Sequence, residues 1–284
     1  MRPVKRHLEI AGHLVELPLP GRARPLDGFW SHGPRRARTL LLFVHGMGGN
    51  FYRSRFKKTV MQQAPARGLD VLSFNNRGYE RDVASEDFRD CLADLDASVA
   101  FGAAQGYRRF VLLGHSTGCQ KITWWQYRRR DPRVAALVLA GIGDDYAIVR
   151  RDLGRDYARR IDQARRWVAR GWTSRKLPAS CLGFTAPRFL SVADPRQLEA
   201  RLFNLDGPLT EFRSLRTPIL ALLPAEEEFA CLPVPELAER LRRRTRSRRF
   251  HAAIVPDADH SFHGAEAAAT QVVLDWLQPE RRRA

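Results

Sequence analysis

A serine stands between two glycines at Gly114-His115-Ser116-Thr117-Gly118, directly after the apolar run 110–113. A serine on a tight turn from a strand into a helix is pushed into the open, where its hydroxyl can attack a carbonyl carbon. Such a turn strains the serine backbone and leaves no room for flanking side chains, which explains Gly114 and Gly118. We therefore predict that Ser116 is a nucleophile.

A serine hydroxyl needs a base to take its proton near neutral pH. The last apolar run ends in "IVPDADHSFHG" (254–264), which offers His260 and His263. His260 falls where the loop should cross the carboxyl edge of a sheet, whereas His263 should begin the closing helix. We therefore predict that His260 is the base.

The base needs a carboxylate to orient it, and two places in the chain could supply one. Glu226, Glu227 and Glu228 follow the apolar run in "LALLPAEEEF" (220–229). Asp144 and Asp145 follow an earlier run in "LAGIGDDY" (139–146). We favour the glutamates, and Glu227 among them, with Glu228, Asp144 and Asp145 as the alternatives.

An oxyanion that forms during attack needs two preorganised N–H groups. The amide of Thr117, at the start of the helix after the serine, is one candidate. The other is the amide of Met47 in the glycine-rich loop "FVHGMGGNF" (43–51), where the backbone can approach a ligand closely.

These residues must be positioned by a regular framework, and the chain alternates between two patterns. Short apolar runs predict strands, and amphipathic stretches between them predict helices. The predicted strands are 39–46, 70–76, 109–115, 133–141, 217–224 and 250–256, and the predicted helices are 55–67, 86–105, 118–130, 233–245 and 263–277. The alternation predicts an α/β fold with a mostly parallel, doubly wound sheet. The segment before it, with its break at Gly12-His13, predicts an antiparallel hairpin.

The alternation lapses between residues 144 and 214, where the pattern is helical and irregular. This stretch is too long for one crossover, so we predict a lid inserted into a single domain that spans residues 1–284. Its aromatic residues either line the substrate pocket or pack in the core of the insertion. They are Trp167, Trp172, Phe184 and Phe189.

The formal charge of +17 raises the question of a nucleic-acid partner. Only five of the 48 basic residues are lysine, and the arginines are spread along the chain. Local runs at 128–130, 242–244 and 281–283 fall at expected helix ends or at the C-terminus, where they complement the helix dipole. We therefore predict no specific nucleic-acid site.

Other classes of protein are excluded by simple counts. The four cysteines lack the paired spacing of a zinc site or a disulfide framework. No apolar stretch approaches the roughly 18 residues that cross a bilayer. The charged N-terminus is unlike a secretory signal peptide, so we expect a cytoplasmic protein with no membrane span, no metal and no other cofactor.

Four motifs now carry a family resemblance. "FVHGMGG", "SFNNRG", "GHSTG" and "DADHSF", in this order and spacing, resemble the α/β-hydrolase superfamily across nearly the whole chain. "GHSTGCQ", "FTAPRFLSV", "LFNLDGPL" and "LLPAEEEF" resemble a narrower subgroup that includes fungal siderophore-ester hydrolases and bacterial relatives. In that subgroup the triad acid stands in a Ser-Gly-x-Asp-Glu-Tyr string, which implies Glu227 here. The chain departs from the string, since Glu replaces Asp and Ala225 replaces Gly.

Together these observations predict a serine hydrolase of the esterase type that acts on a small-molecule ester or thioester. Ser116, His260 and Glu227 would form its triad. Serine at the elbow argues against epoxide or haloalkane hydrolysis, which uses a carboxylate there. The alternatives are an amidase or thioesterase, or a binding protein that keeps the fold without the catalysis.

Overall fold

The computed structural model describes residues 8–35 and 37–278, and these build an eight-stranded sheet in the order β1-β2-β4-β3-β5-β6-β7-β8. The strands from β4 to β8 in this order are parallel to their neighbours, and β1 and β2 join one edge antiparallel. The strands are β1 (Gly12–Leu17), β2 (Leu26–Ser31), β3 (Thr39–Val44), β4 (Leu69–Phe74), β5 (Arg109–His115), β6 (Val134–Ala140), β7 (Ile219–Glu226) and β8 (Phe250–Asp259). The predicted mostly parallel α/β sheet is confirmed.

The opening hairpin is present, but its turn is not at Gly12-His13. Gly12 is the first residue of β1 and pairs with Ser31 of β2, and the connection runs through residues 18–25 instead. Gly12 is required by close packing, because a Cβ there would collide with the carbonyl of Trp30. Sequence reasoning therefore read a packing glycine as a turn glycine.

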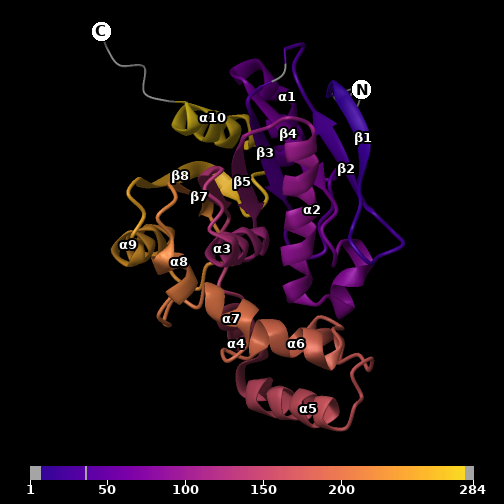
Figure 1. Cartoon of the computed structure of the whole chain (residues 1–284). Helices are drawn as coiled ribbons and strands as arrows, with labels where there is room; N and C mark the ends of the chain where they lie inside the picture. The colour runs from indigo at the N-terminus through magenta and orange to yellow at the C-terminus, as the bar shows by residue number, and fades with distance from the viewer. Residues whose placement is uncertain (1–7, 36, 279–284) are drawn as a thin grey trace, which may run out of the picture.

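Helices cover both faces of the sheet, as Figure 1 shows. The helices outside the segment between β6 and β7 are α1 (Arg55–Gln63), α2 (Cys91–Ala104), α3 (Gly118–Arg129), α9 (Val234–Arg244) and α10 (Glu266–Leu277). Short 3-10 turns lie at Pro65–Arg67, Glu80–Ser85, Phe88–Asp90, Gly154–Asp156 and Ala179–Cys181. Helices α1 and α10 pack on one face, and α2, α3 and α9 pack on the other.

Alternation of side chains along each strand creates these two cores. In β3, Leu40 and Leu42 belong to the core under α2 and α3, whereas Leu41 and Phe43 belong to the core under α1 and α10. All four side chains are buried. A strand that is buried on both faces explains why its sequence is an unbroken apolar run rather than an alternating one.

The chain between β6 and β7 leaves the sheet and forms further helices, which lie together at the bottom of Figure 1 apart from α8. They are α4 (Asp145–Leu153), α5 (Tyr157–Ala169), α6 (Ala186–Ala193), α7 (Leu198–Leu202) and α8 (Thr210–Ser214). Helices α4, α5 and α6 share a hydrophobic cluster of their own, centred on Ile161, Phe184 and Phe189. The part of this segment through α6 thus has a core distinct from the two cores of the sheet, whereas Leu202, Phe203 and Phe212 of the later part belong to the core under α2 and α3.

The basic runs lie where the helix dipole favours them. Helix α3 ends within the run 128–130, and α9 ends within the run 242–244. The run 281–283 lies outside the described residues. No helix in the described part of the chain is both long and apolar enough to cross a membrane.

Candidate active site

Three of the candidate residues stand directly after the carboxyl ends of parallel strands. Ser116 follows β5, Glu227 follows β7, and His260 follows β8. Parallel strands end at the same edge of a sheet, which is where open α/β sheets bind their ligands. The topology therefore brings together residues that lie far apart in the sequence.

The turn after β5 has the strained geometry that the sequence predicts. Ser116 adopts φ 57°, a left-handed value that non-glycine residues rarely take. Its amide donates to the Ala140 carbonyl at 2.9 Å, which anchors the turn to β6. A Cβ at Gly114 would collide with Gly118, and a Cβ at Gly118 would collide with the Val44 carbonyl. Both flanking glycines are therefore required.

His260 and Glu227 form a buried pair. Nδ1 of His260 lies 2.7 Å from Oε1 of Glu227, and both side chains are nearly inaccessible to solvent. The same Glu227 oxygen accepts the Phe229 amide at 3.1 Å. Because a carboxylate can only accept, Nδ1 carries the proton and Nε2 is left as the acceptor. This is the tautomer that a general base needs.

Ser116 and His260 line one cavity of about 340 Å³. The glycine-rich loop after β3 forms another part of its wall, through Gly46, Met47, Gly48 and Gly49. A Cβ at Gly46 would lie 2.6 Å from the Ser116 Cβ, so this loop passes against the serine. The base, the serine and the predicted oxyanion loop therefore share one space.

The amides predicted to bind the oxyanion are both unengaged. Neither the Met47 nor the Thr117 N–H donates a hydrogen bond to any part of the chain that the structure describes. Gly48 holds the loop in a left-handed conformation at φ 63°, and the Gly49 amide closes it on the Gly46 carbonyl at 3.2 Å. Two free donors beside the serine match what an oxyanion hole requires.

The other carboxylates considered for the triad have different partners. Asp144 caps α4 by accepting the Ala147 amide at 2.9 Å, and its second oxygen accepts the Leu205 amide at 2.9 Å. Asp145 accepts from the Gln120 side chain at 3.0 Å. Glu228 accepts the backbone amide of His260 at 3.0 Å, so it holds the histidine's main chain and not its ring.

The rival histidine is exposed and paired elsewhere. Nδ1 of His263 lies 2.7 Å from Asp259, and its side chain is 71% exposed. Asp259 also accepts the His263 amide at 2.9 Å, so the two residues form a local turn before α10. His263 lines the rim of the cavity at Ser116 without contacting Glu227.

Two residues that the sequence analysis did not single out complete the surroundings of His260. His115 donates from Nε2 to the His260 carbonyl at 2.8 Å, and burial together with the nearby His260 lowers the pKa of His115 to about 3. Gly141, at φ 61°, sits where a Cβ would lie 3.2 Å from two ring atoms of His260. A glycine directly after the strand β6 was the signal for the second residue; nothing in the sequence distinguished the first.

The aromatic residues of the segment between β6 and β7 do not line this cavity. Phe184 and Phe189 are buried in that segment's own cluster, and Trp167 packs against it. Trp172 is 39% exposed and stacks with Arg170 and Arg175. Of the two roles weighed for these side chains, packing applies to Phe184, Phe189 and Trp167, and neither applies to Trp172.

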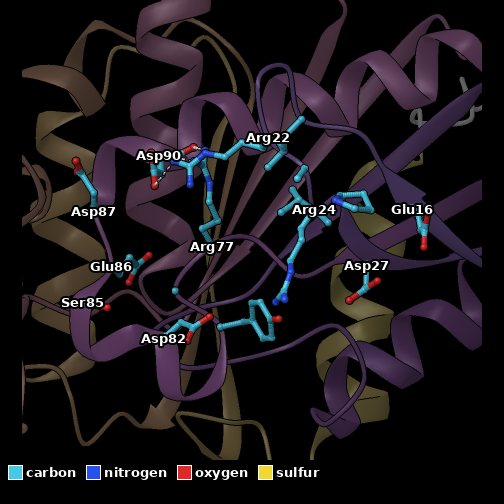
Figure 2. Close-up of a pocket in the computed structure, with 16 residues that line it drawn as sticks. Glu16, Arg22, Arg24, Asp27, Arg77, Asp82, Ser85, Glu86, Asp87 and Asp90 are labelled. Atoms are coloured by element: carbon cyan, nitrogen blue, oxygen red, sulfur yellow. Dashed lines mark hydrogen bonds and ion pairs between the residues drawn. The ribbon is translucent and has the colours of Figure 1, made fainter.

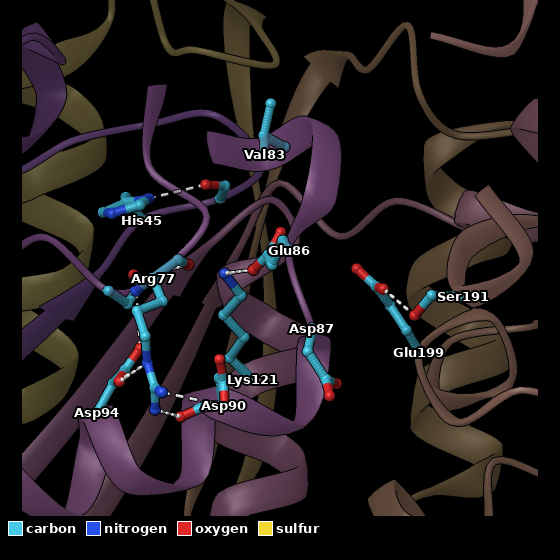
Figure 3. A network of polar contacts seen from close by, with 12 residues as sticks. His45, Arg77, Val83, Glu86, Asp87, Asp90, Asp94, Lys121, Ser191 and Glu199 are labelled. Carbon is cyan, nitrogen blue, oxygen red and sulfur yellow. Dashed lines mark hydrogen bonds and ion pairs between the residues drawn. The ribbon is translucent and has the colours of Figure 1, made fainter. Parts of the chain in front are cut away.

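A buried ionic network ties this segment to the rest of the molecule, and Figure 3 shows its contact between Lys121 and Glu86. Lys121 of α3 contacts Glu86 at 2.6 Å, Arg188 of α6 contacts the other Glu86 oxygen at 3.0 Å, and Arg188 also pairs with Glu199 of α7. Although burial alone would raise it, Lys121 and Arg188 lower the pKa of Glu86. Burial and the neighbouring Glu199 raise the pKa of Asp145 well above its usual range. The network is thus arranged around two cations, Lys121 and Arg188, that share the carboxylate of Glu86.

A second cavity, of about 680 Å³, lies beside Glu86 and is lined in part by residues of the loop 77–90 (Figure 2). Arg22, Arg24 and Arg77 line it together with several carboxylates, and Arg77 is paired with Asp90 at 3.0 Å. None of the candidate catalytic residues reaches it. The described residues also contain no group of three or more His, Cys, Asp or Glu side chains placed to hold a metal ion.

Comparison with known proteins places this geometry in a family. No curated protein matches the sequence. Among solved structures, the fold is similar to the siderophore hydrolase EstB from Aspergillus fumigatus (TM-score 0.71, 17% identity, 94% of this chain and 96% of that chain covered). It is also similar to Est1E from Butyrivibrio proteoclasticus (0.67, 15%, 94% and 97%) and to the Pyrococcus furiosus esterase Pf2001 (0.62, 16%, 95% and 91%). A family model described as the alpha/beta hydrolase family matches residues 41–273, and the chain therefore belongs to the alpha/beta hydrolase family.

Proposed function

We propose that this protein is a serine hydrolase that cleaves carboxylic esters of small molecules through an acyl-enzyme on Ser116. One observation carries the proposal. Nδ1 of His260 is 2.7 Å from a buried Glu227 carboxylate, and the ring shares a cavity with a serine held at φ 57°. A base with the correct tautomer beside an exposed, strained serine is the arrangement that acyl transfer needs.

The residues divide the reaction between them. Ser116 Oγ attacks the ester carbonyl while His260 Nε2 takes its proton, and Glu227 stabilises the resulting imidazolium. The amides of Met47 and Thr117 donate to the oxyanion of the tetrahedral intermediate. His260 then gives its proton to the departing alkoxide, so that an alcohol leaves and the acyl group stays on Ser116. Water attacks the acyl-enzyme with His260 as base, and the acid product leaves as Ser116 regains its proton.

The ester as the substrate bond is supported by the named neighbours, which are an esterase and a siderophore hydrolase. An amide or a thioester could be cleaved by the same machinery, so these remain the alternatives. A pure binding role is the alternative from another class. It is less well supported, because a serine at φ 57° that shares a cavity with the paired His260 and Glu227 is more than binding alone requires.

We further propose that residues 144–214 act as a lid within a single domain spanning residues 1–284. The support is the separate hydrophobic cluster of α4, α5 and α6, against which Met47 of the oxyanion loop also packs. The side chain of Met47 thus connects the segment to the candidate site. We expect a cytoplasmic enzyme that needs no metal or organic cofactor.

Labelling with a fluorophosphonate probe tests the proposal directly. We expect stoichiometric modification at Ser116, found by mass spectrometry of tryptic peptides, and no modification of the Ser116→Ala variant. A panel of p-nitrophenyl esters, thioesters and anilides then ranks the bond types by kcat/KM. An unlabelled, inactive wild-type protein would favour the binding role instead.

A further inference from the structure

The cavity at Ser116 has a one-sided charge. Its charged lining side chains are Arg53, Arg55 and Lys57, and none of its lining residues is Asp or Glu. Helix α1 begins at Arg55, so the positive end of its dipole lies at the same wall. The wall of the cavity at the start of α1 is therefore electropositive.

Lys57 is the unusual member of this set. Its side chain is almost fully buried, and its ammonium donates to the Asn50 carbonyl and lies 5.2 Å from the centroid of the Phe43 ring. No carboxylate of the described residues lies within ion-pair distance of it. Burial, helped by the charge of Lys58, lowers the pKa of Lys57 to about 7. A buried ammonium without a counterion is costly for a protein to keep.

The other fully buried cations in the described part of the chain show the contrast. Lys121 and Arg188, each 1% exposed, are both paired with Glu86, and Arg188 has Glu199 as well. These two cations lie outside the cavity at Ser116, whereas Lys57 lines it. Among the described residues, the fully buried cation that lacks an acidic partner is thus the one that lines the cavity at Ser116.

The exposed cations at the rim are already compensated in part. Arg53 lies 3.3 Å from Glu80, whose same oxygen also accepts from Asn50 at 3.0 Å. Arg55 lies 3.7 Å from Glu266. Because both guanidinium groups are more than half exposed, they are free to turn toward a ligand. They would steer a charged substrate, and Lys57 would hold it.

We infer that this cavity takes esters that carry an anionic group, a carboxylate or a phosphate, whose charge pairs with Lys57 while the ester carbonyl lies at Ser116. The inference rests on the proposed serine-hydrolase function and names its substrate class. An anion at this position supplies the counterion that the fold itself does not provide. The negative charge of the ligand would also raise the pKa of Lys57 and so favour its charged form.

A purely structural role for Lys57 makes a different prediction. Through Asn50 the ammonium braces the loop 46–50, which carries the Met47 amide. Loss of that brace would slow the hydrolysis of every ester by a similar factor. Loss of an anion site would slow only the charged substrates. The ratio of kcat/KM between a charged ester and its neutral analogue therefore separates the two roles.

The experiment uses matched esters on both sides of the scissile bond. The acyl pair is p-nitrophenyl hydrogen glutarate and p-nitrophenyl methyl glutarate. The alcohol set is 4-acetoxybenzoate, 4-acetoxyphenyl phosphate and the neutral methyl 4-acetoxybenzoate. For each charged ester the kcat/KM ratio to its neutral analogue is compared between wild type and variants, so that intrinsic reactivity cancels. The phosphate arm shows which anion the site prefers.

The variants are Lys57→Met, Arg53→Gln and the control Lys58→Met. Lys58 is the next residue of α1, carries the same charge and does not line the cavity. For at least one charged ester we expect the ratio to fall about tenfold or more in Lys57→Met. In Arg53→Gln it should fall less and mainly at low ionic strength, and in Lys58→Met it should stay within about twofold.

Three results would overturn the inference. Equal losses for charged and neutral esters in Lys57→Met would assign the lysine to the loop brace. An unchanged ratio in a folded Lys57→Met protein would remove the anion site, and if that variant does not fold, an unchanged ratio in Arg53→Gln at low salt would do the same. If none of these esters is hydrolysed and the fluorophosphonate probe does not label the protein, both the proposed function and this inference are wrong.

Discussion

Gly141 packs tightly beside His260, because a Cβ there would lie 3.2 Å from the ring Nδ1 and 3.3 Å from Glu227 Oε2 and would crowd both side chains. We predict that Gly141→Ala lowers kcat about tenfold by displacing the His260–Glu227 pair. The left-handed φ of 61° should also cost about 1–2 kcal/mol of stability. Gly171→Ala is the matched control, since Gly171 has a similar φ of 73° with nothing within 4 Å. Activity loss in both variants would show that strain alone, and not the clash, is responsible.

Removing the nucleophile should remove the chemistry and little else. We predict that Ser116→Ala lowers kcat for p-nitrophenyl esters by at least about 10³. The free energy of unfolding should not fall, because alanine tolerates the left-handed turn no worse than serine. Steady-state kinetics and urea unfolding check both statements. Wild-type turnover in the variant would end the proposed mechanism.

The base should be as important as the nucleophile. We predict that His260→Ala matches Ser116→Ala in its loss of kcat and that the double variant is little worse, because the two groups act as one unit. His263→Ala serves as the control, since His263 is exposed and bonded to Asp259. A severe loss in His263→Ala with an active His260→Ala would reverse the assignment.

The acid can be tested by removing charge without removing volume. We predict that Glu227→Gln lowers kcat by about 10²–10⁴, because a side-chain amide can donate to Nδ1 and so favours the wrong tautomer. Glu226→Gln should be nearly silent, and Glu228→Gln intermediate at most, since Glu228 binds only the main chain of His260. If Asp144→Asn or Asp145→Asn abolishes turnover while the glutamate variants stay active, the acid belongs to the strand β6.

The buried network should contribute strongly to stability only while it is complete. We predict that Arg188→Met destabilises the protein by about 3–5 kcal/mol in urea unfolding, because Glu86 and Glu199 lose their shared partner. Adding Glu199→Gln should recover part of the loss. Arg159→Met, which removes an exposed contact to Asp156, should change stability hardly at all. Equal effects of the two arginine changes would contradict a special role for the network.

The high positive charge should produce only weak, non-specific binding to nucleic acid. We predict that duplex DNA binds with a steep dependence on salt and without sequence preference. Fluorescence anisotropy at two salt concentrations, with two unrelated duplexes, checks this. Sub-micromolar binding of one duplex but not the other near physiological salt would show a specific site.

The strands and the residues at their ends could be predicted from the sequence because both depend on local pattern. An unbroken apolar run such as 110–113 is typical of a strand that is buried on both faces of a parallel sheet, and the turn with Ser116 follows it after Gly114 and His115. The pairing of Glu227 with His260 was within reach for the same reason, since β7 and β8 are neighbours. The ends of strands can be read from local sequence, and they decide which distant residues meet at the edge of the sheet.

The remaining features depend on contacts that leave no local pattern. Gly12 and Gly141 look alike in sequence, yet one packs against a carbonyl and the other against an imidazole. Lys57 and Lys58 are adjacent, and only the register of α1 decides that Lys57 is buried. The partners of Arg188, Glu86 and Glu199, lie on two separate segments, and the irregular pattern of residues 144–214 gave no sign of them. Such contacts are set by how elements dock, which no single segment encodes.

The strands β6 and β7 pair with each other, so the chain leaves and re-enters the sheet at adjacent positions. Helices α4, α5 and α6, which share their own cluster, can therefore be exchanged as a cassette without rethreading the sheet, provided that Leu202, Phe203 and Phe212 stay in the core under α2 and α3. The graft has one further condition. A donor segment must supply a cation in place of Arg188, because Glu86 would otherwise keep its contact with Lys121 but lose its contact with Arg188. Chimeras chosen by this rule should fold, and they would let pocket shape be varied independently of the catalytic edge.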